Sequence, residues 1–461
     1  MTFELTWHWP VKWRQALTRD NPSRGSQTGC SGLSPEEPSL WTSNDRWFPP
    51  VSQETISEKN EMPNGNDIRM TSAEAHGEHC YLACVVGARP NFMKMAPLLQ
   101  ALKAYPRIRP VLIHTGQHYD KNLSGVFFEE LRMKRPDISL EVGSDDHGAQ
   151  TARVLERFEA VLKEGPSGGS RYHRVVVVGD VNSTMAATLA AVKLGIPTAH
   201  VEAGLRSFDR TMPEEINRLV TDAISDMLFV SEPSGMENLR AEGHREDQLH
   251  LVGNVMIDTL RNLLPKAEAR DTLASHRLKP SQYGVVTLHR PANVDSRETL
   301  SGLLDVLIEA SRDLQLIFPM HPRTKQRIEQ FELGGRFNAA ARMTRVAPLG
   351  YLDFLALTSK AKVIVTDSGG LQEESTALGI PCLTMRPNTE RPSTVSQGTS
   401  TLVGSDPEKL RSNLRAVVNG TYKRGECPAL WDGKAAERIA GILDRWFQME
   451  AAAAGKLNET W

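Results

Sequence analysis

The sequence predicts an α/β protein built from two open, mostly parallel sheets, each covered by helices. Short apolar runs of strand length alternate with amphipathic helical stretches from residue 81 onward, which is the rhythm of βαβ units. A second series of the same kind begins after Gly253. The chain has 461 residues, enough for two or three domains of ordinary size.

Each apolar run has the length and composition of a buried parallel strand. The predicted strands are residues 81–86, 110–114, 174–178, 197–201 and 227–230, then 284–287, 314–318, 343–346, 362–366 and 382–385. Between them, Val154, Leu155, Phe158, Val161 and Leu162 form one apolar helical stripe. We expect one domain over residues 79–254 and another over 255–433. A final helix near residues 434–449 is expected to pack back on the first.

Residues 1–78 are rich in Ser, Pro, Asn and Glu and hold neither helical nor strand periodicity, so we expect a largely disordered extension. Five of the chain's eight tryptophans lie there, which is unusual for such a segment. A short docking segment, or a true start at Met70, would also fit this composition.

Composition excludes several classes of partner. The net charge is −2 with 24% charged residues, so no overall bias favours nucleic acid or an anionic membrane. No apolar run approaches the roughly 18 residues of a membrane span, and no signal-peptide core is present. The five cysteines form no CxxC pair or Cys/His rhythm, which indicates reduced thiols in a cytoplasmic protein.

A tight turn follows the first predicted strand. Arg89 and Pro90 come directly after Gly87, and Lys94 lies one helical turn further on. Two cations beside a helix N-terminus suit a phosphate or diphosphate, although solvated cations on an ordinary Gly-Pro turn would give the same sequence. The turn lacks GxGxxG, which argues against a nicotinamide or flavin, and we expect no cofactor.

Two acids follow neighbouring strands of the first half. Asp180 comes just after a predicted strand of four consecutive valines, and Glu202 comes just after the next predicted strand. The carboxyl ends of parallel strands share one sheet edge, so the two acids are candidates for a common cleft. Asp180 could instead be a helix cap, and Glu214 after Pro213 could only complement a helix dipole.

The second half offers an anion site. His289 ends its first strand, and a later strand runs into Ser368, Gly369 and Gly370 before a helix, which exposes backbone N–H groups to an anion. Glu374 in that helix could accept hydrogen bonds from a ribose, and Arg391 adds a cation after the next strand. Together these residues predict a cradle for a nucleoside diphosphate.

Eight segments in order resemble the motif series of the non-hydrolysing UDP-N-acetylglucosamine 2-epimerases. They are GARPNFMKMAP, TGQH, VGDVNST, HVEAGLRS, PEEINR, LHRP, TDSGGLQEE and TERP, and the resemblance covers about residues 81–447. It implies two Rossmann-like domains facing across a cleft, as in GT-B glycosyltransferases, and a homodimer.

The resemblance also implies roles for single residues. The implied contacts to UDP are Arg89, Lys94, His289, Phe354, Ser368, Gly369, Gly370, Glu374 and Arg391. The implied catalytic acids are Asp180, Glu202 and Glu214, and His289 joins them by offsetting charge on the departing diphosphate. No metal is implied.

The implied reaction is a reversible C2 epimerisation of UDP-GlcNAc to UDP-ManNAc. UDP is eliminated to a 2-acetamidoglucal and then re-added, with a proton delivered to the other face. We expect closure of the cleft to raise the pKa of at least one of the three acids.

The sequence departs from the common family pattern at Asn91 and at residues 291–293, where many members continue with Glu and with Arg-Glu. These departures call into question activation by a second substrate molecule, which involves these motifs and the region of Gln117. They also leave a modified UDP-GlcNAc, such as a 3-acetamido uronic acid, as an alternative substrate. The sequence further allows a hydrolysing epimerase, a GT-B glycosyltransferase or a silent sugar-nucleotide sensor.

Overall fold

The structure is a computed structural model that describes residues 79–117, 125–166 and 170–458. The predictions for residues 1–78, including the extension and the start at Met70, lie outside these ranges. Across the described ranges, no helix is both long and apolar enough to cross a bilayer.

The first sheet of the described chain has seven parallel strands in the order β3-β2-β1-β4-β5-β6-β7. Their bounds are β1 Cys80–Val86, β2 Ile108–His114, β3 Ile138–Ser139, β4 Arg174–Val178, β5 Thr198–Ala203, β6 Met227–Val230 and β7 Leu249–Leu251. All five strands predicted for this half are present. The two missed strands, β3 and β7, are short pieces at the sheet edges, where too few residues are buried to give a pattern.

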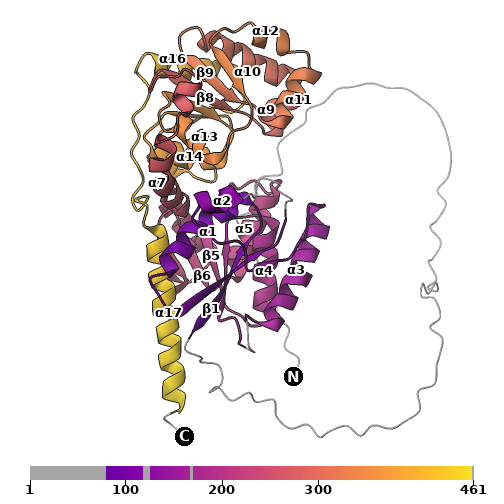
Figure 1. Cartoon of the computed structure of the whole chain (residues 1–461), viewed down its shortest axis with the longest axis vertical. Helices are drawn as coiled ribbons and strands as arrows, with labels where there is room; N and C mark the ends of the chain where they lie inside the picture. Colours follow the sequence, from indigo (N-terminus) through magenta and orange to yellow (C-terminus); the bar gives the residue numbers. More distant parts are fainter. Residues whose placement is uncertain (1–78, 118–124, 167–169, 459–461) are drawn as a thin grey trace, which may run out of the picture. The chain divides into compact units, whose positions relative to one another are not determined.

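The helices of this half connect the strands (Figure 1). They are α1 Arg89–Leu102, α2 Gly125–Glu130, α3 His147–Glu164, α4 Asn182–Lys193, α5 Pro213–Ile224, α6 Pro233–Ala241 and the short 3-10 helix η2 Glu246–Gln248, followed by α7 Val255–Glu268. Of the apolar stripe predicted on α3, Val154, Phe158 and Leu162 are buried, so the amphipathic pattern marks the face by which this helix packs.

The second sheet has six parallel strands among the described residues, in the order β10-β9-β8-β11-β12-β13. Their bounds are β8 Tyr283–Thr287, β9 Gln315–Pro319, β10 Met343–Val346, β11 Val363–Thr366, β12 Cys382–Thr384 and β13 Ser400–Leu402. The predicted architecture of two parallel α/β sheets is therefore confirmed. Here the missed strand is β13, a three-residue edge strand with one fully buried side chain.

Ten further helices belong to the rest of the described chain. They are α8 Thr272–Ser275, α9 Pro291–Val294, α10 Arg297–Ala310, α11 Pro322–Gln330, α12 Gly334–Asn338, α13 Tyr351–Thr358, α14 Gly369–Ala377, α15 Ser393–Ser396, α16 Pro407–Val418 and α17 Ala435–Asn458.

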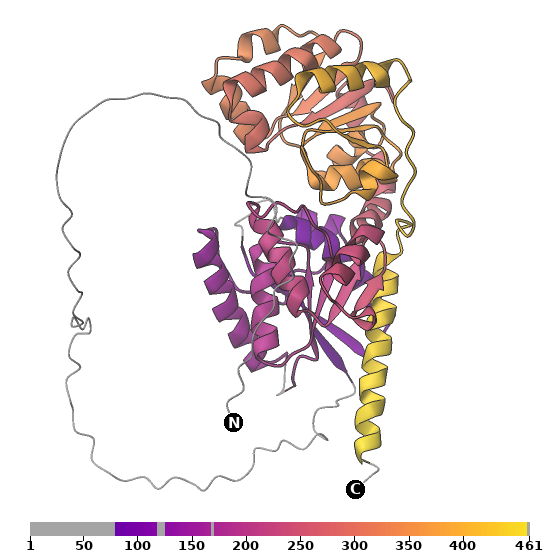
Figure 2. The same cartoon turned by 180° about the vertical axis from the view of Figure 1, so that it is seen from behind.

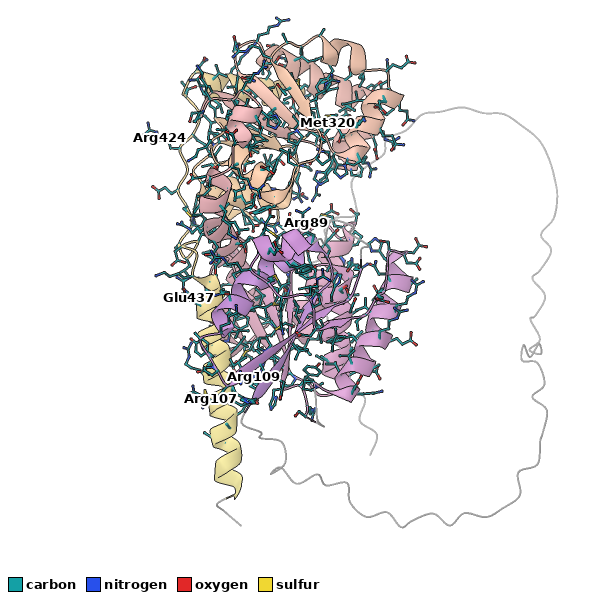
Figure 3. The ribbon with its side chains drawn as sticks, viewed as in Figure 1. Arg89, Arg107, Arg109, Met320, Arg424 and Glu437 are labelled. Atoms are coloured by element: carbon teal, nitrogen blue, oxygen red, sulfur yellow. The ribbon has the colours of Figure 1, made fainter. Side chains whose placement is uncertain are left out.

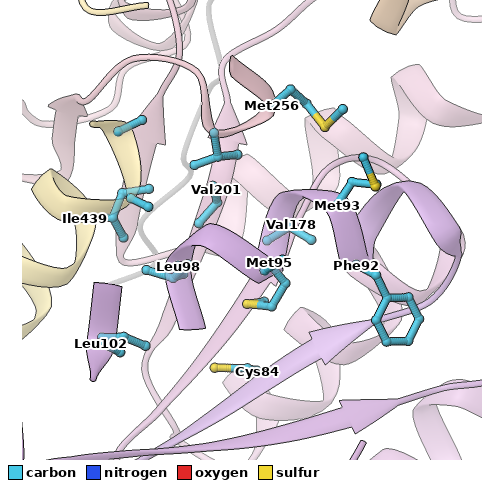
Figure 4. Packing of buried hydrophobic residues seen from close by; sticks show 14 of the residues in the cluster. Cys84, Phe92, Met93, Met95, Leu98, Leu102, Val178, Val201, Met256 and Ile439 are labelled. Atoms are coloured by element: carbon cyan, nitrogen blue, oxygen red, sulfur yellow. The ribbon is translucent and has the colours of Figure 1, made fainter. Parts of the chain in front are cut away.

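Helix α17 returns to the first sheet after the second is complete, and it packs beside α1 and α7 in both views (Figures 1 and 2). Figure 4 shows the shared core, in which Met95 and Leu98 of α1 lie between Val178 of the sheet and Ile439 of α17. Asp258 of α7 holds the start of α17 in this position. Its two carboxylate oxygens accept the backbone N–H groups of Ala435 at 3.1 Å and Ala436 at 2.7 Å. One buried carboxylate thus caps α17.

Replacing Asp258 with Ala should lower the free energy of unfolding by about 1 kcal/mol, because α17 loses the acceptor for two N–H groups in its first turn. Urea denaturation followed by circular dichroism measures this change. The matched control is Glu437→Ala in the same first turn, an exposed side chain whose removal should change stability by less than about 0.5 kcal/mol. Equal effects of the two substitutions would contradict the capping role.

Candidate active site

The turn after β1 is fixed by Asn91. Its side-chain oxygen accepts the backbone N–H of Ala88 at 2.9 Å, and its amide nitrogen donates to the carbonyl of Val178 at 2.8 Å. This pair of bonds ties the start of α1 to the end of β4. As a result Arg89, labelled in Figure 3, and Lys94 on the next turn are both held at the carboxyl end of the first sheet.

The orientation of the Glu202 side chain follows from an irregularity in the hydrogen-bond register of β5. The register between β5 and β6 shifts at this residue, and its φ of +77° is unusual for a residue with a side chain. The side chain is 5% exposed, and its carboxylate forms an ion pair with the Lys94 ammonium. The strained conformation therefore orients an acid toward a cation instead of toward the core.

Gly179 makes room for this pair. Its φ is +69°, and a Cβ atom at this position would lie 2.8 Å from the Lys94 Nζ. Burial alone would raise the pKa of Glu202, but the charges of Lys94 and Arg391 outweigh it and hold that pKa below its ordinary value.

His200, two residues earlier on β5, is held on both ring nitrogens. Nδ1 lies 2.6 Å from an oxygen of Asp222, and Nε2 lies 2.8 Å from the carbonyl oxygen of Gly179. Both ring nitrogens therefore lie against oxygen atoms of the protein. Asp222 is also paired with Arg206 at 2.7 Å. This buried set fixes the Gly179 turn under Lys94.

The two acids at the start of α5 have different surroundings. Glu215 is buried and accepts the backbone N–H groups of Ser207 and Phe208 while it pairs with Arg218, so it holds the preceding loop. Glu214 is exposed and lines a cleft. Arg218 also pairs with Asp180 at the end of β4. The two acids therefore differ in surroundings, although their sequence context is the same.

Asp367, at the end of β11, organises the first turn of the second sheet. One oxygen accepts the backbone N–H groups of His289 at 2.9 Å and Arg290 at 2.8 Å, and the other lies 2.7 Å from the His289 Nδ1. Burial would raise the pKa of Asp367, but the bonds from His289 and the two N–H groups keep it below its ordinary value. His289 is thereby fixed while its ring stays 40% exposed.

The N-terminus of α14 combines with Arg391. A Cβ on Gly369 would lie 3.0 Å from the Arg391 Nη1, whereas one on Gly370 would meet no atom within 4 Å. Two successive glycines therefore bring the helix backbone close to the guanidinium and leave open space beside it. The first N–H groups of a helix carry a partial positive charge, so this end of α14 suits an anion.

Arg391 pairs with three buried carboxylates. Its Nη2 lies 3.1 Å from Glu202 of the first sheet, its Nε lies 2.6 Å from Glu373 of α14, and its Nη1 pairs with the adjacent Glu390. Burial would lower the pKa of Arg391, but the three acids raise it well above its ordinary value. Arg386 pairs with Glu390 from the other side at 2.8 Å. The guanidinium thus links β5 to the second half of the chain.

A cleft of about 530 Å³ opens between these groups. It is lined by Arg89, Pro90, Met93, Lys94, Asp180, Met212, Glu214, Arg218, Met256, Arg290, Leu349, Tyr351, Phe354, Ser368, Gly369, Gly370, Glu373, Glu390 and Arg391. Nine of the twelve predicted site residues are in this set. Glu202, His289 and Glu374 are not, and each instead contacts or immediately precedes a lining residue.

Sequence reasoning missed several lining residues. Arg218 is the last letter of PEEINR and Arg290 lies in LHRP, so both were inside recognised motifs without an assigned role. Tyr351 opens α13, and its hydroxyl donates to Glu374 at 3.0 Å. Burial raises the pKa of Glu374 to about 7. Together with Met256, Leu349 and Phe354, Tyr351 gives the cleft an apolar wall.

The arrangement can bind an anion and move protons at one place. Cations come from both sheets, the N-terminus of α14 lies at the second sheet, and carboxylates lie after β4 and at the start of α5. Within the described ranges, no group of three or more His, Cys, Asp or Glu side chains is placed to hold a metal ion.

Two parallel α/β sheets with a polar cleft at their strand ends define an enzyme of the paired Rossmann-like class. The model of the family described as UDP-N-acetylglucosamine 2-epimerase matches residues 100–444. The chain belongs to this family of isomerases.

Sequence relatives of known name support membership of this family. The UDP-N-acetylglucosamine 2-epimerase of Methanocaldococcus jannaschii is 42% identical over 368 residues, which cover 78% of this chain and 98% of the relative. The UDP-2,3-diacetamido-2,3-dideoxy-D-glucuronate 2-epimerase of Pseudomonas aeruginosa is 37% identical over 363 residues, which cover 78% of this chain and 98% of that relative.

Solved structures are similar over the same part of the chain. The M. jannaschii epimerase in complex with UDP-GlcNAc and UDP superposes with a TM-score of 0.70 at 41% identity, covering 79% of this chain and 99% of that one. The Neisseria meningitidis epimerase bound to UDP-GlcNAc has a TM-score of 0.70 at 26% identity with the same coverage.

Replacing Gly179 with Ala tests how tightly Lys94 is held. The left-handed backbone costs about 1 kcal/mol for any Cβ, and overpacking against the buried Lys94 and Glu202 should add about 1–3 kcal/mol. Gly420→Ala is the matched control, because its φ of +75° is similar and no atom lies within 4 Å of the new methyl. Urea unfolding should show the larger loss for Gly179→Ala, and equal losses would contradict the close packing.

Proposed function

We propose that the chain interconverts UDP-GlcNAc and UDP-ManNAc by eliminating UDP and adding it back. One observation carries the proposal, namely that the N-terminus of α14, which suits an anion, and two carboxylates, Asp180 and Glu214, line the same cleft. The names of the relatives, which act on UDP-linked 2-acetamido sugars, support this substrate class.

The cleft lining suggests the order of the ligand groups. The apolar wall of Tyr351 and Phe354 suits the uracil ring. Glu374 accepts the hydroxyl of Tyr351, and we assign it to the ribose. The diphosphate then meets the N-terminus of α14 and Arg391. These groups offset the negative charge that grows on the diphosphate as it leaves, which is where fixed donors lower a barrier most.

The chemistry requires departure of UDP before the proton is lost, because no carbonyl activates the C2 hydrogen. The C1–O bond breaks and its electron pair leaves with UDP, and a carboxylate then takes the C2 proton as the C1–C2 double bond forms. In the return step a proton reaches C2 from the opposite face, and a diphosphate oxygen attacks C1. Atoms and oxidation states balance without any cofactor.

Asp180 and Glu214 are the acids we assign to the two faces of the sugar, because both line the cleft from different elements. Glu202 lies behind Lys94, so its role is to hold Lys94 and Arg391 and to set their charge. Asp367, which directly precedes Ser368, holds His289, and we assign His289 to offset the charge of the diphosphate. The chemistry gives each acid a proton for only part of the cycle.

Incubation with UDP-GlcNAc in deuterium oxide, followed by proton NMR, tests the proposal. Appearance of UDP-ManNAc with deuterium at C2 and only traces of UDP is the expected result. Stoichiometric UDP with free ManNAc would instead make the enzyme a hydrolysing epimerase. If neither UDP-GlcNAc nor UDP-ManNAc gives any change in its spectrum, the proposed substrate is wrong. The next candidates to test are then modified UDP sugars and glycosyltransferase acceptors.

The neighbouring acids of α5 provide a matched pair of substitutions. Glu214→Gln should lower turnover by about 10²–10⁴, the usual contribution of a general acid or base, while the melting temperature stays unchanged because the side chain is exposed. Glu215→Gln should lower the melting temperature, because the amide cannot replace a carboxylate that accepts two N–H groups and pairs with Arg218. Near-normal turnover in Glu214→Gln would remove it from the mechanism.

A uronic acid derivative is the second candidate substrate. Its extra carboxylate needs a cation, and Arg290 is suited to this role. Burial lowers the pKa of Arg290 and the neighbouring Arg386 lowers it further, so an added anion would stabilise the charged form. The named activity of the P. aeruginosa relative supports this alternative. Comparing kcat/KM for UDP-GlcNAc and for the diacetamido uronate decides between the two substrates.

We also infer a homodimer, as the family resemblance implies. Light scattering after size-exclusion chromatography should give twice the mass of the 51.1 kDa chain. A monomer at micromolar concentration would contradict it.

A further inference from the structure

Glu202 and Glu373 come from opposite halves of the chain and share the guanidinium of Arg391. The Nη2 of Arg391 lies 3.1 Å from Oε1 of Glu202, and its Nε lies 2.6 Å from Oε1 of Glu373. Both side chains are at most 5% exposed. Two carboxylates that share one cation in a buried site cannot both ionise as easily as two separate ones.

The two carboxylates differ in what surrounds them. Both oxygens of Glu202 are in ion pairs, with Lys94 and Arg391. On Glu373, one oxygen accepts from the Asn254 amide at 2.8 Å and pairs with Arg391, but the buried Oε2 has no hydrogen-bond partner among the described residues. An ionised oxygen without a donor is unfavourable in a buried site, so Oε2 is where an added proton would bond.

Several charged groups surround this pair. They are Lys94 of α1, His200 of β5, Glu374 of α14, and Arg391, Glu390 and Arg386 of the segment after β12, with Glu232 close to Arg391. Burial raises the pKa of Glu373 to about 7; Arg391 limits the rise and the Glu202 charge adds to it. At neutral pH the pair is therefore close to taking up a proton.

A bound diphosphate would change this balance. Lys94 and Arg391 line the cleft, and both already neutralise the two acids. Phosphate oxygens that pair with these cations bring new negative charge next to Glu202 and Glu373. Like charges disfavour ionisation, so the protonated form of the pair gains stability when the ligand binds.

We propose that binding of a nucleoside diphosphate in the cleft is linked to uptake of one proton from solvent by the Glu202–Glu373 pair. The proton forms an O–H bond at Glu373 Oε2 and comes from buffer or water, with no oxidation or reduction. Protonation removes the negative charge of Glu373, which weakens the contact between its Oε1 and the Nε of Arg391 and lets the phosphate compete for this donor. The identity of the ligand rests on the proposed function.

Calorimetric titration of UDP into the full chain tests this linkage. At pH 8 the terminal phosphate of UDP, whose second pKa is about 6, is fully ionised and contributes no proton. The slope of the binding enthalpy against buffer ionisation enthalpy, in two buffers at this pH, should show uptake of about 0.5–1 proton. The Kd should also rise up to about tenfold per pH unit between pH 7.5 and 9.

Glu373→Gln should abolish the uptake and flatten the pH dependence while UDP still binds. Glu232→Gln is the matched control, because Glu232 is equally buried, has a raised pKa and an Oε2 without a hydrogen-bond partner among the described residues, yet forms no ion pair with Arg391. Uptake should persist in that variant.

A wild-type chain that binds UDP without proton uptake would overturn the proposal, and so would uptake that persists in Glu373→Gln. If Glu373→Gln does not fold, the pH slope of the wild type and the loss of uptake in Glu202→Gln decide the question. Because the readout is UDP binding and not turnover, a chain that binds UDP without epimerising it leaves this inference standing. Epimerisation without uptake would overturn this inference alone.

Discussion

The ion pairs of Arg391 are the interaction on which the site depends. This residue follows the second sheet, yet it neutralises Glu202 of the first sheet together with Glu373 and Glu390. Removing one partner of a buried ion pair typically costs about 3–5 kcal/mol, because the remaining charge is left unpaired. The proposed function would give Arg391 a second role that competes with the first, since the carboxylates it stabilises occupy the same guanidinium that a phosphate would use.

Backbone geometry brings the partners of Arg391 together. Parallel strands end at one edge of each sheet, so Asp180, just after β4, and Glu202, near the end of the neighbouring β5, lie at the same edge. Ordinary strand geometry is not sufficient, however. Glu202 adopts a left-handed conformation at a register shift, and Gly179 leaves space for the Lys94 ammonium. Strain in the sheet thus places a cation and an acid within one buried pair.

Much of this could be predicted from the sequence, because parallel strands are buried on both faces and read as continuous apolar runs. The two sheets were recognisable for that reason, and the short edge strands were not. Glycines and charged residues directly after strands indicated the cleft. The difference between Glu214 and Glu215 could not be predicted, because it depends on which carboxylate the Ser207 loop folds over. Glu373 is distinguished by contacts to Asn254 and Arg391, which are distant in sequence.

The most direct measurement is a crystal structure of the full chain with UDP. The account predicts phosphate oxygens about 2.7–2.9 Å from the Arg391 guanidinium, beside the N–H groups of Gly369 and Gly370, with the uracil against Phe354. A diphosphate bound elsewhere, with Arg391 still held by all three carboxylates, would contradict the claim that the acids and the phosphate share this cation.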